Sequence, residues 1–183
     1  ALPYGYSIEE PICEGVLTEE VLSFEFENVY TPRPIDLYLY KIDGDAHANK
    51  KRVFLEGAVF ELYHDAELTR KVKADAVVTD ENGKVMYLNL YPGTYYLVEL
   101  ESPEGYRLLV KPVKIKVGKD WKGLYIVIDG DTSNTYRSED SKELFYVVNS
   151  TDEEKNSEAH VSIKNYNGFR LPRSGGIGVW TFV

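Results

Sequence analysis

Three polar residues, Lys41, Glu99 and Asn165, lie where alternating sequence patterns predict side chains in the core. Residues of equal parity share one face of a β-strand. Lys41 continues the parity of the apolar positions in 35–39, and Asn165 continues that of the apolar positions in 161–163. Glu99 shares the parity of the apolar residues before it, in a stretch that is apolar on both faces. We therefore expect all three side chains to point inward.

Burial would turn these three side chains into a reactive set. It favours the neutral amine of a lysine and the protonated acid of a glutamate. The Lys41 amine could then attack the amide carbon of Asn165, while Glu99 polarises the carbonyl group and transfers protons. The products would be an Nε–Cγ isopeptide bond and ammonia. The alternative is a lysine that extends to the surface and an asparagine that caps a turn.

The elements that would position these residues are short β-strands. Strict alternation of apolar and polar residues occurs in 35–40, 113–117 and 161–164. Further runs rich in β-branched and aromatic residues are 53–63, 85–90, 94–100, 124–128 and 144–148. No helical stretch of convincing length and period accompanies them.

Turn sequences separate these predicted strands. The Asn-Gly pair in 80–83 is typical of a tight hairpin, and 91–93 and 102–105 each combine Pro with Gly. The polar stretches 129–141 and 149–158 are expected to be loops. Short strands with such punctuation predict an all-β fold, a Greek-key sandwich of the immunoglobulin or prealbumin type.

The first 34 residues resemble the end of a second, related domain. The sequence PYGY at 3–6 repeats the pattern of PEGY at 103–106, and the alternating FEFEN at 24–28 repeats that of VSIKN at 161–165. A Pro-rich joint at 30–34 follows. We expect residues 1–34 to be the tail of a preceding domain plus a linker. A local amino-terminal extension is the alternative.

Residues 93–106 (GTYYLVELESPEGY) closely resemble the G-x-Y-x-L-x-E-x-x-A-P-x-G-Y box of Cna B-type domains, which occur in pilins and adhesins on Gram-positive cell surfaces. Residues 37–43 resemble the family's opening strand, 55–63 its L-x-G-A-x-F-x-L strand, and 80–84 its hairpin. The resemblance covers residues 35–168 and implies one complete sandwich domain there.

The resemblance also implies roles for individual residues. The family's bond-forming lysine falls on Lys41, its catalytic acid on Glu99 and its acceptor on Asn165. The stretch between Tyr106 and Asn165 is longer than the family's pattern and implies extra strands or an inserted loop, so Asn149 is an alternative acceptor. Asn28 would be the acceptor of the preceding domain.

The carboxyl end, residues 169–183, is Gly-rich and apolar, and it contains a pentapeptide that could direct covalent attachment. Leu171, Pro172, Arg173, Ser174 and Gly175 resemble the L-P-x-T-G signal read by sortase, with Ser in place of the usual Thr. A sortase would cleave after Ser174 and join the new carboxyl group to an amine of the cell wall or of another pilin. The resemblance implies a sorting signal that stops short of its natural end. An ordinary Pro-Gly loop is the alternative.

The composition excludes several classes of protein. Thirty Asp and Glu against twenty-one Lys and Arg give a net charge of −9, which argues against nucleic-acid binding. The single Cys13 excludes an internal disulfide framework and a cysteine zinc cluster. No apolar run is long enough to span a membrane, a length of about 18 residues or more. The only Met is Met86 and no signal peptide is visible, so we expect a fragment or a processed chain.

No metal or other cofactor is expected. His47, His64 and His160 lack the spacing of metal ligands, and Cys13 has no His or Cys partner nearby. Residues 129–140 resemble the start of a calcium loop but have Asn134 where that loop needs Gly.

These observations predict a structural, cell-wall-anchored surface protein, not an enzyme, whose only chemistry on itself is one cross-link. Its expected partners are sortase and either peptidoglycan or another pilin subunit, and its expected location is extracellular. One alternative is a glycan- or matrix-protein-binding module without a cross-link, which the 15 tyrosines could serve. Another is an accessory domain of a secreted enzyme.

Overall fold

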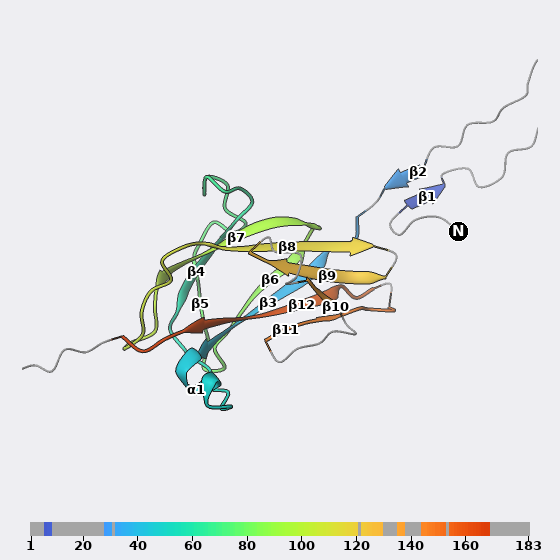
Figure 1. The fold of residues 1–183 in the computed structure, drawn as a ribbon. Coiled ribbons are helices and arrows are strands. Elements are labelled where there is room, and N and C mark those ends of the chain that lie inside the picture. The colour runs from blue at the N-terminus through green and yellow to red at the C-terminus, as the bar shows by residue number, and fades with distance from the viewer. Residues whose placement is uncertain are drawn as a thin grey trace, which may run out of the picture.

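The protein folds as two β-sheets packed face to face (Figure 1). The computed structural model describes residues 6–8, 28–30, 32–120, 122–129, 135–137, 144–152 and 154–168. Within these residues every long element is a strand, as the alternating sequence predicts. The one helix, α1 (Gly44–Ala48), is a single turn, and no helix of the described residues could cross a membrane.

The larger sheet has six strands in the order β10-β9-β8-β7-β4-β5, and all its pairs are antiparallel. The strands are β4 (Val59–Tyr63), β5 (Val77–Val78), β7 (Gly93–Glu101), β8 (Val113–Asp120), β9 (Gly123–Ile128) and β10 (Thr135–Arg137). Sequential hairpins join β7, β8, β9 and β10. Glu99 lies near the end of β7, one of the two strands in the middle of this sheet.

The smaller sheet has four strands in the order β11-β12-β3-β6. They are β3 (Ile35–Asp43), β6 (Lys84–Leu90), β11 (Phe145–Val148) and β12 (Ser157–Asn165). The two central strands, β3 and β12, run parallel from the pair Ser157–Ile35 to the pair Asn165–Asp43. Strands far apart in the sequence therefore lie side by side along their whole length.

The core lies between the two sheets and is built from the inward positions of each strand. In β3 the buried residues Ile35, Leu37 and Leu39 alternate with partly exposed ones, which is the pattern that the sequence predicts. They pack with residues of the opposite sheet such as Leu97 and Ile115 in one continuous apolar cluster. The next inward position after Leu39 is Lys41, so the lysine occupies the end of this core.

The turn at 80–83 differs from the predicted hairpin. The strands that it joins, β5 and β6, belong to different sheets, so the turn connects the two layers. Gly83 has a φ of 65°, and its N–H donates to the Asp80 carbonyl at 2.8 Å. An Asn-Gly pair indicates a turn with positive φ but does not specify which strands pair on either side.

Other boundaries also differ from the expectation. The predicted strand 53–63 is regular only from Val59, and Phe54 forms an isolated bridge with Ile42. The predicted loop 129–141 contains β10, and the predicted loop 149–158 ends where β12 begins at Ser157. Because their sequences are polar, neither the short edge strand β10 nor the start of the central strand β12 was predicted.

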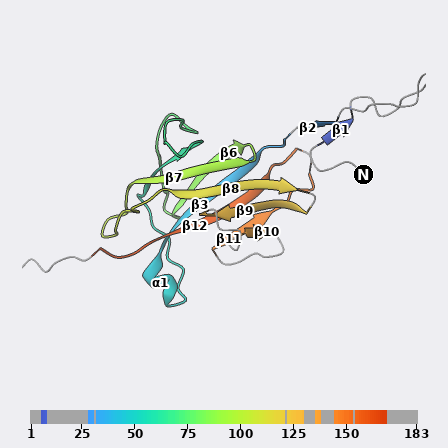
Figure 2. The same cartoon turned by 45° about the horizontal axis from the view of Figure 1, so that its top comes forward.

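Two short strands precede the sandwich. β1 (Tyr6–Ile8) and β2 (Asn28–Tyr30) pair with each other in a separate antiparallel ladder, drawn apart from the two sheets in Figures 1 and 2. Strand β3 then begins at Ile35, directly after the Pro-rich joint. Most of residues 1–31, Cys13 among them, and all of 169–183, which contain the sorting sequence predicted at 171–175, lie outside the described residues.

Candidate functional site

Lys41, Glu99 and Asn165 meet at one end of the core. Lys41 comes from β3, Asn165 from the neighbouring parallel strand β12, and Glu99 from β7 in the opposite sheet. Their exposed fractions are 0%, 4% and 1%. The predicted inward orientation of all three side chains is therefore confirmed, and the alternative of a surface lysine and an exposed turn-capping asparagine is wrong.

One oxygen of Glu99 contacts both of the other residues. Glu99 Oε1 lies 2.9 Å from Lys41 Nζ, and it accepts a hydrogen bond from Asn165 Nδ2 at 2.9 Å. The Lys41 ammonium lacks the alignment of a hydrogen bond to any described residue, and Asn165 Oδ1 is buried without a donor among them. The lysine nitrogen and the asparagine amide thus flank a single carboxylate oxygen.

The register explains why these two residues lie together. Lys41 pairs with Ile163 across the parallel ladder, so Asn165 lies two positions further along the adjacent strand and on the same face. Same-face diagonal neighbours in a sheet are within reach of long side chains. The flexible lysine stem spans this offset and carries Nζ toward the asparagine.

The environment of Lys41 favours its neutral form. Burial lowers the pKa of Lys41 from its ordinary value of 10.5 to about 8, although the neighbouring Glu99 opposes this shift. The Phe60 ring lies beside the amine, with its centroid 5.2 Å from Nζ. With a pKa of about 8, a minority of this amine is unprotonated near neutral pH, and that fraction grows as the pH rises.

A backbone hydrogen bond with Gly83 fixes the main chain at Lys41. Lys41 N donates to the Gly83 carbonyl at 2.7 Å, and Leu55 N donates to the Lys41 carbonyl at 2.9 Å. A Cβ atom on Gly83 would lie 2.6 Å from the Lys41 oxygen, a distance that real Cβ atoms do not show. Glycine is therefore required at this turn by space as well as by its positive φ.

A second polar contact ties the surrounding loops together. The Tyr106 hydroxyl donates to Asp43 Oδ2 at 2.9 Å, while Asp43 Oδ1 accepts from the backbone N–H groups of Asp45 and Ala46 and caps α1. Tyr106 also bridges to Asn167, just beyond β12. The β7–β8 loop, the end of β3 and the end of β12 are thereby joined beside the site.

The alternative acceptor, Asn149, lies at the other end of the sandwich. Its Oδ1 accepts from Leu124 N at 2.7 Å, and its neighbour Ser150 donates to Ser157 at the start of β12. Asn165 is the last residue of β12, eight residues after Ser157, which corresponds to about 26 Å at the usual rise per residue. Asn149 is therefore not placed to react with Lys41. Asn28 lies on β2, away from these residues in the chain.

Tyrosines of the smaller sheet stack on His160. On its outer face the His160 ring lies between Tyr38, at 4.7 Å, and Tyr146, at 4.1 Å, with the rings within 9° of parallel. Lys84 Nζ lies 4.6 Å above the Tyr38 ring. The Tyr38 ring thus contacts both a neighbouring imidazole and an ammonium group.

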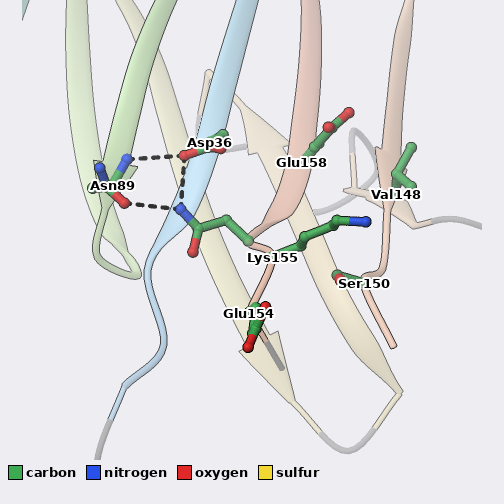
Figure 3. Close-up of a pocket in the computed structure, with 8 residues that line it drawn as sticks. Asp36, Asn89, Val148, Ser150, Glu154, Lys155 and Glu158 are labelled. Atoms are coloured by element: carbon green, nitrogen blue, oxygen red, sulfur yellow. Dashed lines mark hydrogen bonds between the residues drawn. The ribbon is translucent and has the colours of Figure 1, made fainter. Parts of the chain in front are cut away.

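A pocket of about 470 Å³ opens near the start of β3 (Figure 3). Asp36 Oδ1 accepts hydrogen bonds from Asn89 N and Asn156 Nδ2, both at 2.9 Å, and Glu158 lines the neighbouring wall. The hydrogen bonds drawn in Figure 3 join Asp36, Asn89 and Asn156. No group of three or more potential metal ligands occurs among the described residues, and most of the calcium-loop sequence at 129–140 lies outside them.

Two contributors to the site were missed by sequence reasoning. Leu109 N donates to Glu99 Oε2 at 2.8 Å from an irregular loop with no periodic pattern. The contact between Tyr106 and Asp43 joins residues 63 apart in the sequence. The PEGY turn does mark Tyr106 as a special position, but nothing in the sequence indicates its partner.

Several pilus proteins of known structure are similar to this chain at low sequence identity. No curated protein matches the chain. Among solved structures, the group B streptococcus pilus 2b backbone protein is 22% identical with a TM-score of 0.46, covering 82% of this chain and 47% of its own. The C-terminal fragment of the pilus adhesin SpaC from Lactobacillus rhamnosus GG is 21% identical with a TM-score of 0.49, covering 76% and 47%. The chain thus spans less than half the length of either protein.

A family match covers the part of the chain that contains Lys41 and Glu99. The family described as SpaA, prealbumin-like fold domain, matches residues 37–133, from the third residue of β3 to beyond β9. This is more than half of the 183 residues, and the observed two-sheet, all-β sandwich agrees with it. The chain therefore belongs to the SpaA family of prealbumin-like fold domains.

Proposed function

We propose that residues 35–168 form a structural domain of a Gram-positive pilin or adhesin, closed by an isopeptide bond between Lys41 and Asn165. The observation that carries the proposal is the contact of one buried Glu99 oxygen with both Lys41 Nζ and Asn165 Nδ2, each at 2.9 Å. A buried lysine and carboxylate are unfavourable for stability, because removing two charges from water costs free energy that well-packed apolar residues at the same positions would not cost. This cost favours a chemical role for the three side chains.

The proposed reaction starts from a neutral Lys41 amine and a protonated Glu99. The proton moves from Nζ to Oε1 inside the site, so the reactive form has the same number of protons as the ion pair. Nζ then attacks Cγ of Asn165, and the bond from Cγ to Nδ2 breaks. Glu99 gives its proton to the departing Nδ2 and takes one from the attacking nitrogen. One molecule of ammonia leaves, and Glu99 is again protonated at the end of the reaction.

The position of Asn165 Nδ2 suits this sequence of steps. Nδ2 is the atom that must gain a proton before it departs, and it already contacts the oxygen that would supply that proton. The buried Oδ1 receives no hydrogen bond from the described residues, so the carbonyl group is free to bind a donor as negative charge develops on it.

Mass spectrometry of the intact protein tests the cross-link. The wild-type chain should be lighter than its sequence by one ammonia, about 17 Da. Lys41→Ala and Glu99→Ala should each have the full sequence mass. Lys84→Ala is the matched control, because that lysine lies over Tyr38 on the outer face and should leave the loss unchanged. An unshifted wild-type mass would contradict the proposal.

We further propose that the domain is attached at the cell surface through residues 171–175. In this proposal residues 1–34 are the tail of a related domain with Asn28 as its acceptor, and sortase and peptidoglycan or another pilin are the partners. The support is the LPRSG sequence at 171–175, which follows β12, the last strand of the sandwich. Incubation of the chain with a sortase and a glycine peptide should yield a product joined through Ser174. Gly175→Ala should block it, and joining elsewhere would contradict the assignment.

A further inference from the structure

The second oxygen of Glu99 is held by the backbone. Oε1 contacts the two reacting groups, whereas Oε2 accepts the Leu109 N–H at 2.8 Å. We infer that the Leu109 amide is a positioning group for the cross-linking reaction: it occupies Oε2, so that protons enter and leave the carboxyl group only through Oε1. This inference rests on the proposed function and assigns a role within it to a group that does not touch the reacting atoms.

The loop that carries Leu109 is anchored so that it can hold this contact. It leaves β7 after Glu101 and is tied to the chain beyond β12 by the pairs Arg107 N to Tyr166 O, at 3.0 Å, and Gly168 N to Gly105 O, at 2.8 Å. The Leu109 side chain packs against the apolar core. The loop thus lies beside the end of β12 (Figures 1 and 2), and its Leu109 N–H reaches the carboxyl group.

The hydrogen bond restricts the carboxyl group in two ways. The terminal torsion of a glutamate is broad, so an unrestrained carboxyl group can rotate away from Nζ and Nδ2. A donor on Oε2 opposes this rotation. When the group is protonated, the same donor requires Oε2 to be the carbonyl oxygen and leaves the hydroxyl hydrogen on Oε1, facing the amide that must receive it.

An amide-to-ester replacement isolates this donor. Full chains assembled by chemical ligation with the hydroxy acid analogue of leucine at 109 keep the side chain but lack the N–H. The same replacement at Leu108, an exposed neighbour, is the control. Refolding by dilution from denaturant starts the reaction, the loss of ammonia is followed by mass, and folding is followed by circular dichroism.

We expect the 109 ester to cross-link about tenfold more slowly than the 108 ester, the effect of losing one hydrogen bond that holds the carboxyl group in place. Both esters should reach the same folded circular dichroism signal, whereas a general loosening of the loop would weaken the signal of the 109 ester. Cross-linking rates within about twofold of each other, or a slower reaction accompanied by a weaker folded signal, would overturn the inference. If the wild-type chain loses no ammonia, the proposed function itself fails.

Discussion

Lys41 makes the stability of the uncross-linked protein depend on pH. Its folded pKa of about 8 lies below the ordinary 10.5, so between these values the unfolded chain binds more protons than the folded one. Stability should therefore rise with pH across this window, by at most about 3 kcal/mol. Below pH 8 the lysine is charged in both states, and its full burial cost is present.

The Asn165→Ala variant, which lacks the acceptor, allows this dependence to be measured. Its free energy of unfolding is measured by urea titration between pH 7 and 10.5, together with that of the Lys41→Met, Asn165→Ala double variant. As the pH rises, the free energy of the single variant should increase relative to that of the double variant. Tyr40 and Tyr87, whose pKa values burial raises, oppose stability at high pH in both proteins and cancel in the comparison. Parallel curves for the two variants would show that Lys41 is not held in a desolvated site.

At the scale of elements, alternation together with β-branched and aromatic runs predicted most strands of both sheets, whereas polar sequence gave no sign of β10 or of the start of β12. β3, β6, β7, β8 and β9 lie within a residue or a few of their predicted positions, because each contributes apolar side chains to the core. β10 has only three residues and lies in a polar stretch. Its pairing with β9, rather than the β propensity of its sequence, therefore accounts for its strand conformation.

The same distinction separates the parts of the site. The inward positions of Lys41 and Asn165 followed from parity along their own strands, which is local information. The parallel pairing of β3 with β12, and the approach of Glu99 from the other sheet, depend on contacts between segments more than 50 residues apart. Leu109 reaches the site from an irregular loop, where no period exists to predict orientation.

For the whole molecule, the parallel arrangement of β3 and β12 determines how a pulling force would pass through the domain. Force applied to the two ends of the chain enters β3 at Ile35 and leaves β12 after Asn165, at opposite ends of the smaller sheet. A bond from Lys41 to Asn165 would join the far end of β3 directly to the end of β12, where the force leaves the domain. Only the first residues of β3 would then carry the load, and everything from 42 to 164 would lie inside a closed loop.

This closed loop has a thermodynamic and a mechanical consequence. By the chain-entropy relation used for disulfides, closing about 125 residues is worth about 5 kcal/mol. In single-molecule stretching, the wild-type domain should not release the loop, whereas Lys41→Ala should unfold with an added length of about 440 Å, from about 120 extended residues. Reductant should not alter the wild-type trace, because the bond is an amide. Release of the full length from the wild-type chain would show that the force path bypasses Lys41 and Asn165.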